Sequence, residues 1–181
     1  MEIRAISLAA SCVALTGCGG GGGVTFADFA NLDAATDLNE LTPDSTVNGA
    51  ADTLQYSGFV NIGPDTGGSA LVGFVGNLDL TVDFAEDTID GSATNFGEWT
   101  SASPSGSIPS VSGSLDIDGT LTAVNDDGLG DGMDGTAVGT VGGYDFNMTF
   151  EGNVLGADRS GVVLYFDNIA DMGGGVGIGI R

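Results

Sequence analysis

The sequence predicts an all-β protein: a single eight-stranded antiparallel β-barrel, preceded by a signal peptide and a flexible glycine-rich tether. Three observations predict this fold class. From Thr53 onward, apolar and polar residues alternate with a period of two, the pattern of half-buried strands. Turn-forming residues separate these runs, and no segment strongly favours a helix. Glycine supplies 33 of the 181 residues, as expected where the strands of a small barrel bend.

Residues 1–17 have the composition of a signal peptide. Arg4 precedes an apolar run of small residues that is too short to span a bilayer. The run ends in Leu15-Thr16-Gly17-Cys18, which resembles the bacterial lipobox, whose cysteine receives lipid and becomes the new N-terminus. We predict lipid attachment at Cys18 rather than at Cys12, which has no leucine three residues before it.

Residues 18–50 are expected to form a lipid-anchored flexible leader. Gly19 to Gly23 favour a flexible coil that holds the fold away from the membrane. The following stretch allows a short amphipathic helix, but Pro43 and many Asp, Asn and Thr residues favour an irregular chain. The residue after the cysteine is Gly19 rather than aspartate. By resemblance to the sorting rules of bacterial lipoproteins, this predicts the outer membrane rather than retention at the inner one. We expect the cell surface rather than the periplasmic face.

Residues 51–181 are expected to form the barrel. Five runs alternate clearly, and their apolar side chains are predicted to face the core. They are Leu54, Tyr56, Val60 and Ile62; Leu78, Leu80, Val82 and Phe84; Leu115, Ile117 and Leu121; Tyr144, Phe146, Met148 and Phe150; and Val162, Leu164 and Phe166. Turn residues such as Ala85-Glu86-Asp87 and Gly142-Gly143 lie between the strands.

Two stretches and the chain's end resemble the barrel domains of transferrin-binding protein B and related surface lipoproteins. The residues that match are Leu80, Thr81, Val82, Asp83, Phe84, Thr88 and Gly91; Phe150, Gly152, Gly156, Ala157 and Gly161; and Val176, Gly177, Gly179 and Arg181. The resemblance implies a barrel that binds a partner at the cell surface, in nutrient or metal acquisition. The chain has room for one barrel, contains no lysine and lacks a counterpart of the family's handle surface, so transferrin binding is not carried over.

Composition excludes several classes of function. The net charge of −22 excludes a nucleic-acid partner, because nothing neutralises a row of phosphates. The chain has no histidine, which excludes a serine–histidine triad and a two-histidine zinc motif. It has no cysteine after Cys18, which excludes a thiolate metal site and a cysteine nucleophile in the barrel. No motif singles out a catalytic pair among the 25 acidic residues, so we predict that the protein is not an enzyme.

The stretch from Asn125 to Gly135 is the one candidate for a metal site. Asp126, Asp127, Asp131 and Asp134 supply hard oxygen ligands between glycines, which suits Ca²⁺. The spacing does not fit an EF-hand, and the alternative is a flexible acidic hairpin loop. The sequence thus predicts no cofactor and offers candidate residues for calcium alone.

The predicted function is that of a non-enzymatic binding protein, attached by its lipid to the outer membrane. An extracellular protein or nutrient would contact the loops Gly63–Gly68, Phe96–Pro109 and Asn125–Gly135. Trp99, expected in a loop, either anchors a ligand or packs over the end of the barrel. Two alternatives stay open: a structural or adhesive envelope lipoprotein without a small ligand, and a transmembrane barrel.

Overall fold

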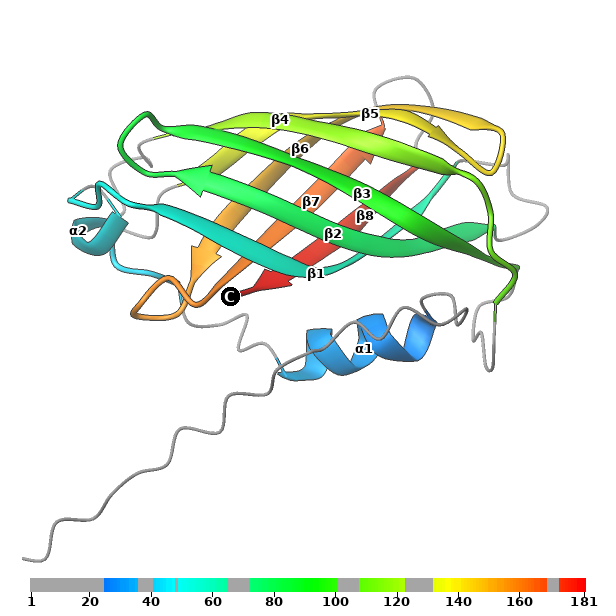
Figure 1. The fold of residues 1–181 in the computed structure, drawn as a ribbon, viewed down its shortest axis with the longest axis horizontal. Helices are drawn as coiled ribbons and strands as arrows, with labels where there is room; N and C mark the ends of the chain where they lie inside the picture. The colour runs from blue at the N-terminus through cyan, green and yellow to red at the C-terminus, as the bar shows by residue number, and fades with distance from the viewer. Residues whose placement is uncertain are drawn as a thin grey trace, which may run out of the picture.

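The computed structural model describes residues 25–35, 41–47, 49–64, 72–100, 108–122, 132–168 and 173–181. Eight antiparallel strands close into a barrel in chain order, with β8 paired to β1, as the sequence predicts (Figure 1). The strands are β1 (Thr53–Gly63), β2 (Gly73–Asp83), β3 (Thr88–Trp99), β4 (Gly113–Thr122), β5 (Gly132–Val141), β6 (Tyr144–Leu155), β7 (Gly161–Asn168) and β8 (Gly174–Ile180). The predicted signal peptide and Cys18 lie outside the described residues.

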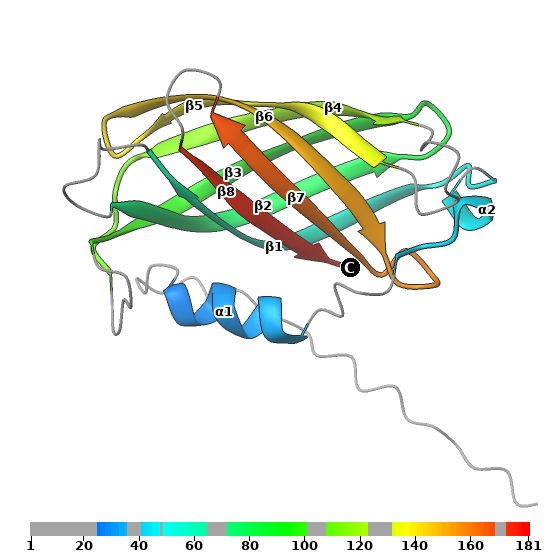
Figure 2. The same cartoon turned by 180° about the vertical axis from the view of Figure 1, so that it is seen from behind.

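The described residues also form two helices. Helix α1 (Phe26–Ala35) lies along the outside of the barrel, and α2 (Asp44–Val47) lies at one of its ends (Figures 1 and 2). Val47 is 3% exposed and belongs to the barrel core, so packing extends upstream of residue 51. Among the described helices, none has the length and apolar composition needed to cross a bilayer.

The interior of the barrel is filled with side chains. The predicted inward-facing residues are buried, with the exception of Leu54, which is partly buried, and Tyr144, which is 39% exposed at the mouth of the barrel. Inward-facing glycines make room for large rings. A Cβ at Gly135 would lie 2.5 Å from Phe150 Cε1, and one at Gly119 would lie 2.8 Å from Phe150 Cζ. The large ring of Phe150 thus fills the space that glycines leave on the neighbouring strands, as in close-packed protein interiors.

The connections between strands alternate between two ends of the barrel. At the first, called the Gly142 end, the chain passes from β1 to β2, β3 to β4, β5 to β6 and β7 to β8. At the second, called the Arg159 end, it passes from β2 to β3, β4 to β5 and β6 to β7. The β5–β6 connection is the predicted Gly142-Gly143 turn. Both glycines have positive φ, 59° and 87°, which suits a two-residue hairpin turn that L side chains rarely adopt.

Helix α1 corrects the expectation of an irregular leader. Its start is stabilised by a capping box: the Asp28 backbone N–H donates to Thr25 Oγ1, and the Thr25 N–H donates to Asp28 Oδ2 at 2.8 Å. Thr25-Phe26-Ala27-Asp28 was the local signal for this helix start. Tertiary packing supplies the rest, because Phe29 is 8% exposed and packs against apolar side chains on the outside of the barrel.

Trp99 lies at the end of β3, not in a loop. An extra residue in β3 at Asn95, which has φ 55°, forms a bulge opposite Gly76 and changes which residues of β3 point outward. The indole lies over Gly73, where a Cβ would clash with the ring, and donates from Nε1 to Asn61 Oδ1 at 3.1 Å. Trp99 therefore packs on the outer wall of the barrel rather than over its end.

Gly73→Ala should displace the Trp99 ring. The added methyl group would occupy the volume of the indole, so the ring moves toward water and its fluorescence emission shifts to longer wavelength. Trp99 is the single tryptophan, so steady-state emission of the full chain reports this site alone. Gly161→Ala is the control, because its φ is not positive and a Cβ there would come no nearer than 3.3 Å to another atom. An unshifted Gly73→Ala spectrum would contradict the packing described.

Candidate functional site

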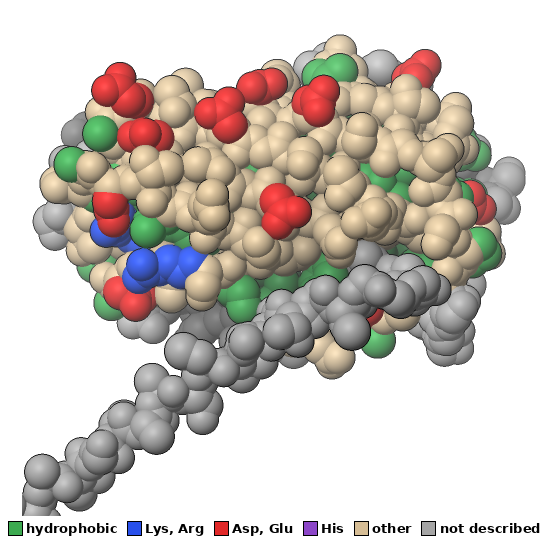
Figure 3. Space-filling view, in the orientation of Figure 1, with side chains coloured by type: hydrophobic (Ala, Val, Ile, Leu, Met, Phe, Trp, Pro, Cys, Tyr) green, Lys and Arg blue, Asp and Glu red, His purple; other side chains and the backbone are tan. Residues whose placement is uncertain are grey.

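The outer surface of the barrel is polar and strongly acidic over six of its eight strands. The charged residues in these strands are all acidic: Asp79 and Asp83 in β2, Asp90 and Glu98 in β3, Asp116 and Asp118 in β4, Asp134 in β5, Asp145 and Glu151 in β6, and Asp167 in β7. Figure 3 shows acidic side chains along the upper part of one face and the arginines at one end. The two arginines of the described residues, Arg159 and Arg181, leave this acidic surface uncompensated.

A groove crosses the outer face of β5, β6 and β7. It has a volume of about 300 Å³ and is lined by Asp134, Gly135, Thr149, Phe150, Glu151, Tyr165 and Asp167. The Phe150 ring itself points into the barrel. Strand pairing produces this set, because Asp134 lies opposite Glu151, and Glu151 lies opposite Tyr165. Tyr165 is 49% exposed, which gives the groove an apolar wall beside its carboxylates.

Asp134 is the one calcium candidate among the described residues. It lies in β5, exposed, and its Oδ2 accepts a 2.7 Å hydrogen bond from Thr122 Oγ1. Asp126, Asp127 and Asp131 lie outside the described residues. Within the described ranges, no group of three or more His, Cys, Asp or Glu residues is arranged to hold a metal ion. The structure instead pairs Asp134 with Glu151, which sequence reasoning did not associate with it.

Like charges face each other directly across the sheet at two places. Asp90 in β3 is the register partner of Asp118 in β4, and Asp134 in β5 is the register partner of Glu151 in β6. Directly opposed like charges destabilise a sheet, and the net charge of −22 adds self-repulsion over the whole surface. Both effects are screened by salt, so the barrel should gain stability as ionic strength rises.

Asp118→Asn should raise the melting temperature at low ionic strength, because it removes the repulsion with Asp90. The gain should shrink toward zero in molar salt, where the Debye length falls to about 3 Å. Asp145→Asn is the matched control, since Asp145 lies opposite Thr140 and accepts a 2.7 Å hydrogen bond from its hydroxyl. Thermal unfolding at low and high salt measures both variants. A gain for Asp118→Asn that is the same at high salt would contradict the electrostatic explanation.

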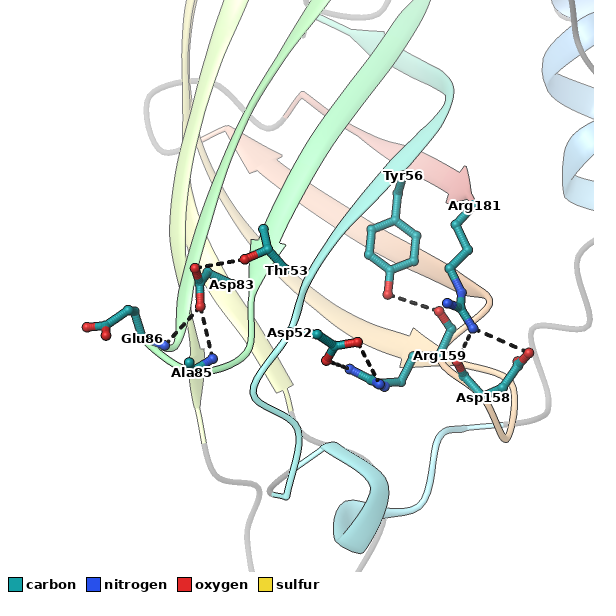
Figure 4. Close-up of polar contacts among 9 residues, drawn as sticks. All are labelled: Asp52, Thr53, Tyr56, Asp83, Ala85, Glu86, Asp158, Arg159 and Arg181. Carbon is teal, nitrogen blue, oxygen red and sulfur yellow. Dashed lines mark hydrogen bonds and ion pairs between the residues drawn. The ribbon is translucent and has the colours of Figure 1, made fainter.

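The Arg159 end is closed by a polar cluster, shown in Figure 4. Arg159 Nη1 lies 2.6 Å from Asp52 Oδ1, and its guanidinium lies 4.6 Å from the centroid of the Phe84 ring. Tyr56 donates its hydroxyl proton to the Arg159 backbone carbonyl at 3.0 Å. Arg181 Nη2 donates to the Asp158 backbone carbonyl at 2.6 Å. These contacts join the β6–β7 turn, the start of β1 and the end of β8.

Ionisation at this end follows from these contacts. The hydrogen bond from Arg159 lowers the pKa of Asp52 and in turn raises the pKa of Arg159. Hydrogen bonds from the Thr53 hydroxyl and from the Ala85 and Glu86 backbone amides lower the pKa of Asp83 (Figure 4). Burial raises the pKa of Tyr56 to about 12. Arg159 Nε is buried without a hydrogen-bond partner, but the other polar groups named here are paired. The cluster stabilises the barrel rather than offering a reactive group.

The three predicted contact loops do not come together. Gly63–Gly68 joins β1 to β2 and Phe96–Pro109 joins β3 to β4, so both belong to the Gly142 end. Asn125–Gly135 leads from β4 to β5 at the Arg159 end. The predicted loop bounds are corrected by the structure, since Gly63 belongs to β1, 96–99 to β3 and 132–135 to β5. The parts 65–71, 101–107 and 123–131 lie outside the described residues. One ligand therefore cannot bridge all three loops without spanning the length of the barrel.

Comparison of the chain with known protein families, with curated proteins and with solved structures finds no match. The resemblance to the barrels of transferrin-binding protein B is untested by these comparisons and stays a prediction.

Proposed function

We propose that this chain is a lipid-anchored protein of the outer membrane whose barrel binds a partner through its outer surface, without catalysis. The filled interior is the observation that carries the proposal. Aromatic and aliphatic side chains occupy the space inside the barrel, in contrast to eight-stranded barrels that hold a small ligand there. Binding is then left to the outer wall and the loops, which suits a macromolecular partner.

The polar outer wall supports a barrel that is surrounded by water. The outward positions of β4 are Ser114, Asp116, Asp118, Thr120 and Thr122, and each is exposed. A barrel that crosses a bilayer presents an apolar band to lipid, and charged residues there are costly. Attachment through an acylated Cys18, which the lipobox resemblance predicts, is compatible with this wall because acyl chains alone enter the bilayer.

Protease added to intact cells tests the surface location. Digestion of the wild-type protein, together with loss of membrane attachment in a Cys18→Ala variant, is expected. Protection of a wild-type protein whose attachment depends on Cys18 would place the barrel in the periplasm and contradict binding at the surface.

A structural or adhesive role is the second candidate, favoured by the compact, fully packed barrel. A pull-down from growth medium with the immobilised protein distinguishes the binding role from the structural one. A binding protein should retain a partner saturably and be induced by nutrient starvation. A structural protein should retain none and be abundant in all conditions.

A further inference from the structure

The uncharged side of the barrel is the starting point. Strands β1 and β8 contain no charged residue, whereas each of the other six strands contains at least one carboxylate. These two strands are neighbours because their pairing closes the barrel. The barrel therefore has one neutral side, β1 with β8, and an acidic surface over the remaining strands.

Helix α1 is fixed to this neutral side. It contacts β1 and β8, and both views show it along the outer wall below them (Figures 1 and 2). Phe29 packs in a cluster with Val75, Val163 and Ile178, which are buried although they point away from the barrel interior. α1 has two acidic residues of its own: Asp28 is used in the capping box, and Asp33 is exposed.

The position of the predicted anchor adds a distance limit. Residues 19–24 separate Cys18 from Thr25, the residue before α1. A fully extended chain of this length spans at most about 25 Å. An acyl group on Cys18 therefore keeps the start of α1, and the wall beneath it, close to the lipid surface.

We propose that the neutral side of the barrel, with α1 on it, faces the lipid surface, and that the opposite side, β4 and β5, faces the medium. This orientation rests on the proposed acylation of Cys18. Charge favours it as well, since anionic head groups repel carboxylates over about a Debye length. On this side Asp28 and Asp33 of α1 are the carboxylates, and β1 and β8 carry none. The partner surface is then the outer wall around β4 to β6, which includes Asp134 and Glu151 of the groove.

Energy transfer from the protein to labelled lipid tests the orientation. The acylated protein is reconstituted on vesicles of phosphatidylethanolamine and phosphatidylglycerol containing a head-group acceptor dye. A donor dye is attached to Gln55→Cys on β1, which belongs to the neutral side, or to Ser114→Cys on β4, both exposed positions. The described residues contain no native cysteine to compete for the dye. We expect the Gln55→Cys donor to lose most of its emission and the Ser114→Cys donor to keep most of it.

Releasing α1 is the matched control. Phe29→Asp places a charge in the apolar cluster beneath α1 and should remove the difference between the two donors while the barrel stays folded. Equal transfer from both donors in the otherwise unchanged protein would overturn the orientation. So would a difference that persists in a folded Phe29→Asp variant. Vesicle flotation is read separately: a protein that does not float contradicts the anchor itself, and with it the proposed function.

Discussion

Phe150→Ala is expected to lower the free energy of unfolding by about 3–5 kcal/mol, the usual cost of deleting a buried phenylalanine ring. Phe150 is 2% exposed and meets Phe166 edge-on at a centroid distance of 5.8 Å. Gly119 and Gly135 supply no side chain that can move into the space left by the ring. The resulting cavity should stay open, which places the cost at the upper part of this range.

Urea unfolding of the full chain, followed by circular dichroism, measures this cost. Tyr165→Ala is the matched control, because it removes an aromatic ring that is 49% exposed on the neighbouring strand β7. Its expected cost is within about 0.5 kcal/mol, as for most surface substitutions. Similar costs for the two variants would contradict a barrel interior centred on Phe150.

The second large effect is a loss of stability at alkaline pH through Tyr56. Burial raises the pKa of Tyr56 from 10.0 to about 12, so the folded state favours the neutral phenol. The stabilisation is fully present below pH 10, and it is lost as the pH rises from 10 through 12. A shift of about two units corresponds to about 2–3 kcal/mol. The chain has no lysine and no histidine, so few other groups titrate in this window.

Tyr56→Phe isolates this contribution. At neutral pH the variant loses the hydrogen bond to the Arg159 carbonyl, which should cost about 1 kcal/mol. Between pH 10 and 12 the variant should lose less stability than the wild type, because it has no phenol at position 56 to ionise. The other tyrosines, Tyr144 and Tyr165, are present in both proteins and contribute equally. Parallel stability curves for the two proteins over this range would show that Tyr56 is not responsible.

The barrel could be predicted from the sequence because its signal is local and repeated. Leu78, Leu80 and Val82 alternate with polar residues, and the structure buries all three. Alternation fixes which side of a strand is buried but not which strands are neighbours. The pairing of Asp134 with Glu151 could have been predicted, because the two-residue turn Gly142-Gly143 sets the register of β5 and β6. The pairing of Asp52 with Arg159 depends on contacts across many residues of chain and has no local signature.

Helix α1 and its contact surface had weaker signals. The capping box Thr25–Asp28 marks the helix start, but the helix is stabilised mainly by an apolar surface on the outside of the barrel. That surface was visible in Val162-Val163-Leu164, where apolar residues occupy both faces of β7. A run of this kind indicates that both faces are covered. The outward position of Val163 was not recognised, because the other strands alternate regularly between apolar and polar residues. The outward position of Trp99 could not be predicted either, because the bulge at Asn95 shifts the alternation of β3 by one residue.

The acylation of Cys18 is the claim on which surface location, tether and orientation all depend. Mass spectrometry of the N-terminal peptide, isolated from the membrane fraction, tests it most directly. The account predicts a mature chain that begins at Cys18 and carries the mass of attached acyl chains. A mature chain that begins elsewhere, or an unmodified Cys18 in a protein recovered from the soluble fraction, would contradict it.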